Sequence, residues 1–191
     1  MGTLIIQQIF PLYIIRPASL VKNKGDYIMA KQLSGFPNYS QTDGSWEYLC
    51  TTDGDFEEYG CGICCCANIT QYKEGGTKSP ATMRSRGVFT ASNLATQWSN
   101  ASTQFSWGGE EYASNMSGAI KEIKKQIDNY SDPVVLRIGN SSTKHFVTVW
   151  GYKNSCTSAS DVLIRDSYNN DTTLQAALGT WPTFYYLKRI I

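Results

Sequence analysis

The sequence contains little charge and no strongly basic segment. Charged residues make up 17% of its 191 residues, and the formal net charge at pH 7 is +1. The short stretch 121–125 holds three lysines, but Glu122 interrupts them, and the pattern is that of the exposed face of a helix. A nucleic-acid-binding protein would concentrate Lys and Arg on one surface. We therefore expect no nucleic-acid partner.

Long apolar runs are also missing. Residues 4–15 are apolar, but they are fewer than a membrane-spanning helix requires, and Pro11 interrupts them. A secretory signal peptide would place positive charge before the apolar run, whereas here the lysines follow it. We expect no stable membrane insertion.

The start of the domain is predicted at Met29. Residues 24–26 (Lys-Gly-Asp) are what AAAGGAGAT, a purine-rich ribosome-binding sequence, would encode if it were translated, and Met29 follows closely. Residues 1–28 are therefore interpreted as an N-terminal extension, either a leader or a non-native start, and residues 29–191 as one domain. N-terminal sequencing of protein made from its own gene tests this interpretation, and a mature chain that begins before residue 24 would contradict it.

Metal-binding cysteine pairs are scarce. The chain has six cysteines, and Cys61 and Cys64 have the spacing of zinc ligands, but no second close pair accompanies them, so a zinc site is the weaker alternative. Cys64, Cys65 and Cys66 are consecutive, and neighbouring residues on a helix point in different directions, so they make a poor disulfide framework. We expect most of these thiols to be reduced and buried, and we expect neither a metal nor an organic cofactor.

Helical patterns precede strand patterns along the chain. Residues 31–60 are rich in Gly, Pro, Asn, Asp and Ser and are predicted to be loop-like. The segregation of helices from strands indicates an α+β fold rather than alternating βαβ units. The predicted helices run from 61 to about 73, from Ser79-Pro80 onward, over 91–98 and over 117–130, and the predicted strands are 133–138, 145–152, 161–166 and 183–187.

The single histidine is the only candidate for base chemistry by imidazole. His145 opens an apolar strand, and Asp166 ends the next one. If the two strands form an antiparallel hairpin with residue 152 opposite about 160, residue 145 lies opposite about 167. Asp166 would then accept the proton of one imidazole nitrogen and leave the other nitrogen to face a nucleophile. The alternatives are a histidine packed at a sheet edge and an aspartate that only caps the turn 167–170.

The nucleophile is predicted to be a cysteine at a helix N-terminus, where the helix dipole and free N–H groups favour a thiolate. Cys61 fits because it joins a polar loop to an apolar helix, and the glycines on both sides of it would let a substrate backbone come close. Cys64 lies further into the helix and is the reserve candidate. The backbone N–H of Cys61 is the natural first oxyanion donor, and a side-chain amide from Gln41 or Gln32 is the second.

The order of these motifs resembles the C39-like branch of the papain-like cysteine peptidases. That family shows a Gln followed by Asp and an aromatic residue, then Gly-Cys-Gly at a helix start with a small residue six places after the Cys. A Pro-Val strand, a His-aromatic-Val strand ending in Gly-Tyr and a strand ending in Asp come later. The corresponding segments, within residues 36–168, are Ser40-Gln41-Thr-Asp43 with Trp46, Gly60-Cys61-Gly62 with Ala67, Asp132-Pro133-Val134-Val135, 145–152 (HFVTVWGY) and 162–166 (VLIRD).

The sequence departs from the family pattern at two places. Three cysteines stand where the family has residues of Pro, Ser or Thr type, and no proline follows Asp166. In the papain branch proper, Cys-Gly-x-Cys carries its nucleophile on the second cysteine, which would be Cys64 here. The spacing to Ala67 and the lack of a tryptophan after Cys64 favour Cys61 instead.

The resemblance implies a papain-like α+β fold in which N-terminal helices pack on a C-terminal antiparallel sheet. It implies that Cys61 is the nucleophile and His145 its base. Asp166 would be the acid that orients the base, and Gln41 the oxyanion donor. The implied activity is that of a cysteine peptidase that cleaves an amide bond through an acyl-enzyme.

The substrate is predicted from composition and analogy. C39-like domains fused to transporters trim leader peptides, but neither a membrane span nor a nucleotide-binding loop is evident here. A polar, weakly charged sequence rich in Tyr, Asn and Ser suits a bacterial or phage protein that acts on peptides or cell-wall peptide cross-links, outside the cell, at the cell envelope or on a virion. The alternatives are a non-catalytic binding or structural module on the same fold and a thiol-based acyltransferase or transamidase.

Overall fold

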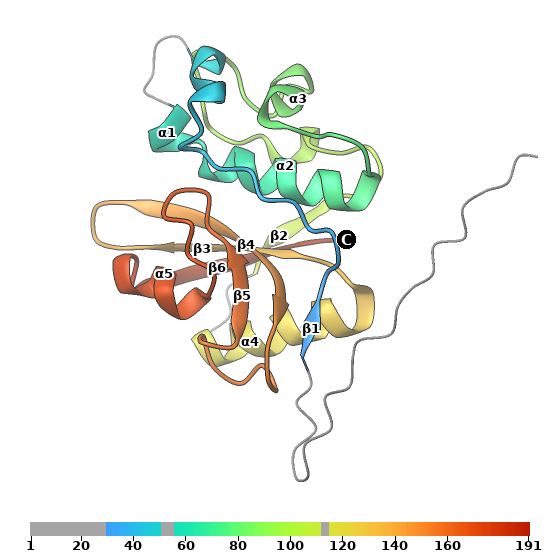
Figure 1. Cartoon of the computed structure of the whole chain (residues 1–191), viewed down its shortest axis with the longest axis vertical. Coiled ribbons are helices and arrows are strands. Elements are labelled where there is room, and N and C mark those ends of the chain that lie inside the picture. Colours follow the sequence, from blue (N-terminus) through green and yellow to red (C-terminus); the bar gives the residue numbers. More distant parts are fainter. Residues whose placement is uncertain (1–29, 51–55, 112–114) are drawn as a thin grey trace, which may run out of the picture.

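A computed structural model describes residues 30–50, 56–111 and 115–191 (Figure 1). The extension predicted for residues 1–28 lies outside the described residues, so the boundary at Met29 stays a prediction. No helix among the described residues is long and apolar enough to cross a membrane.

A six-stranded sheet occupies the middle of the molecule (Figure 1). The strand order is β1-β4-β3-β6-β2, β5 pairs with β4, and every pairing between these strands is antiparallel. The central β3 is buried along most of its length, which agrees with a sequence that is apolar except for Arg137. The strands are β1 (Lys31–Gln32), β2 (Trp107–Glu111), β3 (Val134–Gly139), β4 (Lys144–Tyr152), β5 (Val162–Arg165) and β6 (Thr183–Ile190).

Helices cover both faces of this sheet (Figure 1). The helices α1, α2 and α3 gather on one side, α4 lies on the other, and α5 lies beside β3 and β5. The predicted α+β fold is therefore confirmed. The α-helices are α1 (Phe56–Tyr59), α2 (Cys61–Glu74), α3 (Pro80–Ser85), α4 (Met116–Lys125) and α5 (Leu174–Thr180), with 3-10 helices η1 (Gly44–Leu49) and η2 (Trp98–Asn100) and a π-helical turn, η3 (Gln126–Tyr130), that continues α4.

Local signals in the sequence set the ends of the two long helices. Helix α2 begins directly after Gly60 and ends at Gly75, whose φ of +71° is a conformation that glycine adopts without strain. Helix α4 begins at Asn115, whose side chain accepts a hydrogen bond from the backbone N–H of Gly118. Both helices were predicted from the sequence, and both predictions are confirmed.

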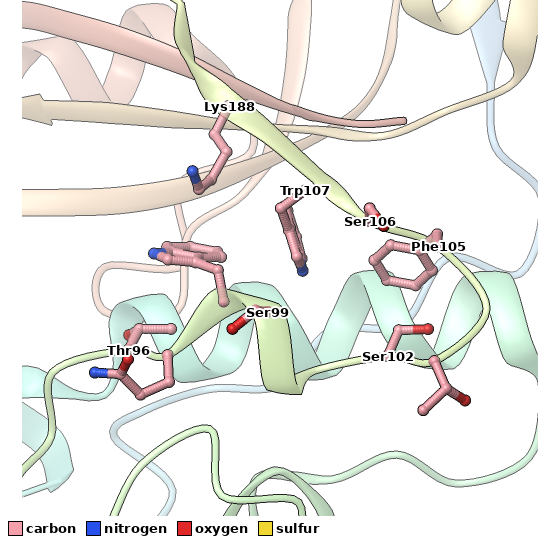
Figure 2. Close-up of a pocket in the computed structure, with 10 residues that line it drawn as sticks. Thr96, Ser99, Ser102, Phe105, Ser106, Trp107 and Lys188 are labelled. Carbon is pink, nitrogen blue, oxygen red and sulfur yellow. The ribbon is translucent and has the colours of Figure 1, made fainter.

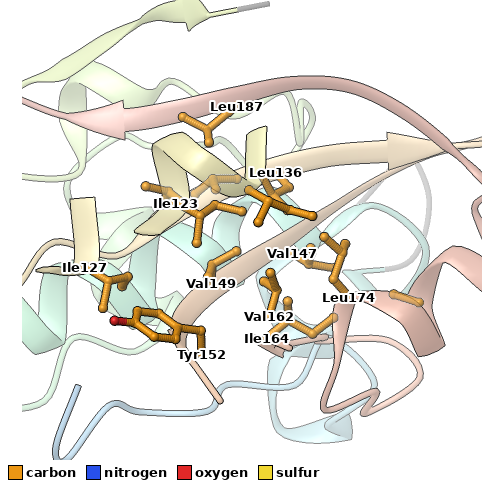
Figure 3. Packing of buried hydrophobic residues seen from close by; sticks show 14 of the residues in the cluster. Ile123, Ile127, Leu136, Val147, Val149, Tyr152, Val162, Ile164, Leu174 and Leu187 are labelled. Atoms are coloured by element: carbon orange, nitrogen blue, oxygen red, sulfur yellow. The ribbon is translucent and has the colours of Figure 1, made fainter. Parts of the chain in front are cut away.

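Two clusters of buried side chains stabilise the fold, and α2 lies between them. The larger cluster, here called the sheet core, joins the strands to α4 and to one side of α2 (Figure 3). The smaller cluster, here called the helical core, joins the other side of α2 to α3, the segment 88–101 and Phe56. Cys65 and Ile69 belong to the sheet core, and Ile63, Cys64 and Cys66 belong to the helical core. Helix α2 is consequently buried on both sides.

The prediction of a helix over residues 91–98 is wrong. Thr90 and Asn93 instead pair across a tight turn, and η2 begins only at Trp98. The Asn93 side chain accepts a hydrogen bond from the N–H of Ala95, and such a local bond competes with helix formation.

Short elements were not predicted from the sequence. Residues 31–60, predicted to be loop-like, contain β1, η1 and α1. Strand β2 has the sequence Trp-Gly-Gly-Glu-Glu, which lacks the β-branched residues of a strand, and it forms because β6 pairs with it. Helix α5 has only seven residues, and Thr173 caps it through the N–H of Ala176.

Candidate active site

Cys61 is the first residue of α2 and lies where that helix meets the sheet. Its side chain is largely buried, with 8% exposed, and lines a cavity of about 420 Å³ together with Gly62, Leu94 and Phe146. The backbone N–H groups of a helix's first turn have no acceptor within the helix, and the helix dipole adds partial positive charge there. This environment stabilises negative charge on a thiol.

The glycines beside Cys61 make room for the protein's own residues. A methyl group on Gly60 would lie 2.5 Å from the carbonyl oxygen of Phe56, and one on Gly62 would lie 2.4 Å from Oγ1 of Thr96. The expectation that both glycines serve the approach of a substrate backbone is therefore corrected, because Phe56 and Thr96 already fill those spaces. Their role is to let α1 and the 90–97 segment pack closely around Cys61.

The other cysteines of α2 differ from Cys61 in their exposure. Cys64, Cys65 and Cys66 are almost completely buried, and all six cysteines of the chain are free thiols. Burial raises the pKa of each of these three thiols well above its ordinary value. Cys64, the reserve candidate for the nucleophile, is therefore a buried neutral thiol within the helical core.

His145 and Asp166 meet at one end of the β4–β5 pair. The Nε2 atom of His145 lies 2.8 Å from Oδ1 of Asp166, and both side chains are buried. The predicted register is off by two residues, because Tyr152 pairs with Val162 rather than with a residue near 160. An irregularity between Val149 and Gly151 shifts the ladder, yet the start of β4 still lies beside the end of β5.

The imidazole of His145 bridges Asp166 and Cys61. Burial lowers the pKa of His145, but the hydrogen bonds and electrostatic interactions with Asp166 and Cys61 raise it from 6.5 to about 9. Burial raises the pKa of Asp166. Its interactions with His145 and with the backbone N–H groups of Tyr168 and Asn169 outweigh burial, so the pKa of this carboxyl lies below its usual value. The carboxylate therefore accepts the Nε2 proton, and Nδ1 is left for the thiol.

Asp166 also caps the turn that follows it. Its Oδ1 atom accepts hydrogen bonds from the backbone N–H groups of Tyr168, at 2.9 Å, and Asn169, at 3.2 Å. The two interpretations of this residue, as a partner of His145 and as a turn cap, therefore describe the same carboxylate. Because the backbone bonds hold the carboxylate in place, they also fix the position of the imidazole.

Gln41 lies close to the pair and is held by two contacts. Ser167 donates its hydroxyl proton to Oε1 of Gln41 at 2.7 Å, and the Nε2 of Gln41 donates to the carbonyl oxygen of Glu57. An amide nitrogen carries two protons, and only one of them is used in this contact with Glu57. Gln32, the other amide considered, pairs with Gly151 at the far end of β4.

Two further residues hold His145 and Gln41 in place, and they were not identified as part of the site from the sequence. The ring of Trp181 stacks on His145 with 4.1 Å between centroids and 22° between planes. Ser167 joins Gln41 to the turn after Asp166, through its hydroxyl and through its carbonyl oxygen, which accepts the N–H of Gln41 at 2.9 Å. Adjacency to Asp166 is a signal for Ser167, whereas no local pattern marks Trp181, which follows α5.

A second cavity adjoins the site on the His145 side. It has a volume of about 480 Å³ and is lined by Gln41, His145 and Trp181, among others. Glu58 and Lys144 line both this cavity and the one beside Cys61. The two hollows therefore adjoin each other at these two residues, one on the Cys61 side and one on the His145 side. In the described parts of the chain, no three His, Cys, Asp or Glu side chains converge in a way that could hold a metal ion.

Sequence comparison adds a family assignment to this geometry. The model of the Peptidase_C39 like family matches residues 33–187, which is most of the chain and includes all four predicted site residues. No curated protein matches the sequence. The match confirms the resemblance noted from the motifs, and with the helices packed on an antiparallel sheet it agrees with the predicted papain-like fold.

Proposed function

Since the chain belongs to the Peptidase_C39 like family, we propose that it is a cysteine peptidase with Cys61 as nucleophile. The observation that carries the proposal is the imidazole of His145, which bonds to Asp166 through Nε2 and to the Cys61 thiol on its other side. Buried neighbours such as Cys64 lack such a partner set and have raised pKa values. The geometry therefore supports one activated thiol.

In the proposed reaction, His145 takes the thiol proton of Cys61, and the resulting thiolate attacks the carbonyl carbon of an amide. A C–S bond forms, and the carbonyl electrons move to oxygen, which the backbone N–H of Cys61 and the free proton of Gln41 Nε2 stabilise. The C–N bond then breaks as His145 protonates the leaving amine. Water, deprotonated by His145, hydrolyses the thioester and restores the thiol.

We propose peptides, including the peptide cross-links of bacterial cell walls, as the substrate class. The hydroxyl- and amide-rich sequence and the cavities beside Cys61 and His145, whose lining includes Glu58 and Lys144, support a polar chain as ligand. A protein of this kind acts outside the cell, at the envelope or on a virion. No metal or organic cofactor takes part in the proposed chemistry.

Alkylation kinetics test the thiol directly. Iodoacetamide labelling between pH 4 and 9, with the modified cysteine located by mass spectrometry, should modify Cys61 rapidly even below pH 6. The partly exposed Cys50 serves as an internal reference, and His145→Ala should reduce Cys61 labelling to the rate of Cys50 at acid pH. Equal labelling of both cysteines, unchanged by His145→Ala, would contradict the proposal and favour a binding module. Product analysis with an added amine distinguishes hydrolysis from transamidation.

A further inference from the structure

A cavity of about 630 Å³ lies beyond the active site, among η2, the segment that follows it, β2 and β6 (Figure 2). Its volume is within the range of small-molecule sites in proteins. The proposed reaction uses none of the residues in it. Its wall combines three aromatic rings with hydroxyl and amide side chains, and this composition is informative about a ligand.

The aromatic part of the wall consists of Trp98, Phe105 and Trp107. The centroids of Trp98 and Trp107 are 4.9 Å apart and those of Phe105 and Trp107 are 5.6 Å apart, both edge to face. All three rings are only partly buried. Figure 2 shows Trp107 extending from β2 toward η2 with its indole nitrogen at the far end. That nitrogen is itself buried and has no hydrogen-bond acceptor among the described residues.

Apart from one lysine, the polar part of the wall is neutral. Hydroxyl groups of Ser99, Thr103 and Ser106 and the amide of Gln97 line the cavity, and among the residues that the structure describes no acidic side chain does. Lys188, the cation in this wall, is buried and donates a hydrogen bond of 3.1 Å to the carbonyl oxygen of Gly108. A nucleic acid would require several free cations for its phosphates. Neutral hydroxyls around exposed ring surfaces instead match a saccharide, which has apolar C–H faces and a rim of hydroxyl groups.

The cavity adjoins the proposed substrate cleft at Thr96. Thr96 lines both this cavity and the one that contains Cys61, and its Oγ1 atom packs against Gly62. A ligand held beside Trp98 would therefore lie next to the cavity that contains Cys61. We propose that this cavity binds a saccharide unit of the substrate while the peptide attached to it occupies the catalytic cleft. The placement of the peptide in the catalytic cleft rests on the proposed peptidase function, whereas saccharide binding in the cavity does not.

Binding is tested first, without catalysis, in the full chain carrying Cys61→Ala. Oligomers of N-acetylglucosamine are the probe, and the indole N–H signals of the five tryptophans are followed by NMR. Trp98 and Trp107 should shift with saturation, whereas Trp46 and Trp150, which lie outside the cavity wall, should not. Shifts produced by a free peptide but not by the oligomer would overturn the proposal and assign the cavity to peptide.

A filling variant provides the matched control. Ser99 is exposed and lines the cavity, so Ser99→Tyr should weaken oligomer binding by at least about tenfold. Ser160→Tyr places the same side chain on an exposed residue outside the cavity wall and should leave binding unchanged. Equal affinity in both variants would overturn the assignment of the site. Unaltered far-UV and thermal profiles establish that each variant is folded.

The catalytic part is tested separately in protein with an intact thiol. A peptide joined to a saccharide should be cleaved faster than the same free peptide, and Ser99→Tyr should remove this advantage without slowing cleavage of the free peptide. Failure to cleave either substrate, with oligomer binding retained, would contradict the peptidase function and leave the saccharide site standing. If the unmodified protein cleaved the saccharide-linked peptide and the free peptide at equal rates, the proposed link between the saccharide cavity and the catalytic cleft would be overturned.

Discussion

The helical half and the sheet half of the molecule are packed in different ways. In the helical core, α2 itself contributes small side chains, among them Cys64, Cys66 and Ala67, and these let neighbouring segments approach the helix closely. The sheet core is built from larger aliphatic side chains of the strands and α4, such as Ile123 and Leu136 (Figure 3). Close packing positions the N-terminus of α2, whereas the sheet supplies a rigid support.

Each half of the molecule contributes residues to the candidate site. Cys61 is placed by α2 and its close neighbours, and His145 and Asp166 are placed by the ends of β4 and β5. The thiol and the imidazole meet only where the two halves touch. This comparison predicts that changes on the sheet side affect protonation and stability most, and that single changes of small side chains in the helical core have milder effects.

The largest effect is expected from Asp166→Asn. An amide at this position no longer favours the proton on Nε2 of His145, so the base loses the correct tautomer for the thiol. We expect kcat/KM for amide cleavage to fall by about 10²–10⁴-fold. Steady-state kinetics measure the loss, with Asp161→Asn on the β4–β5 loop as the control. A decrease of less than threefold would show that Asp166 only caps its turn.

A large loss of stability is expected in the sheet core. Ile123 on α4 is fully buried among strand residues, and Ile123→Ala should lower the free energy of unfolding by about 2–5 kcal/mol. Urea denaturation measures this change. Lys121→Ala, on the exposed face of the same helix, is the matched control and should change stability little. Equal effects of the two variants would show that α4 does not anchor the sheet.

The pH dependence of stability should report the His145 environment. Its pKa is raised from 6.5 to about 9, so the stabilisation is fully present below pH 6.5 and decreases as the pH rises through about 9. We expect a loss of about 3 kcal/mol across this window, because one pKa unit corresponds to about 1.4 kcal/mol. The buried thiols of Cys64 and Cys66 also have raised pKa values, so they too lower the free energy of unfolding as the pH becomes alkaline.

The difference between the unmodified protein and His145→Gln isolates the contribution of the histidine. Urea denaturation at intervals from pH 6 to 9 should show a steeper decrease for the unmodified protein, and most of the difference should arise above pH 6.5. Parallel curves would mean that the imidazole titrates alike in the folded and unfolded chain.

The smallest effect is expected in the helical core. Cys66 is fully buried, and Cys66→Ala removes only its sulfur atom, so the expected loss is about 1 kcal/mol with activity retained. Thermal denaturation and the peptidase assay check both parts. A loss of activity comparable to that of Asp166→Asn would show that the spacing around α2 controls the thiol more strongly than the sheet does.

Much of the fold follows from local patterns in the amino-acid sequence. The periodic isoleucines of α4, the apolar strands β3 to β5 and the glycines that bound α2 are local signals, because periodicity and backbone freedom act over a few residues. They were sufficient to predict the α+β fold. The single histidine, the aspartate at a strand end and the cysteine at a helix start also identified Cys61, His145 and Asp166 as candidates from residue type and position alone.

The tertiary structure decided what depends on distant contacts. The β4–β5 irregularity set the register, the packing of Phe56 and Thr96 gave the glycines beside Cys61 their role, and Trp181 reached His145 from beyond α5. Strand β2 formed because β6 pairs with it, although its own sequence does not favour a strand. The aromatic cavity likewise combines residues from η2, β2 and β6. Such contacts join residues far apart in the chain, so no local pattern in the sequence records them.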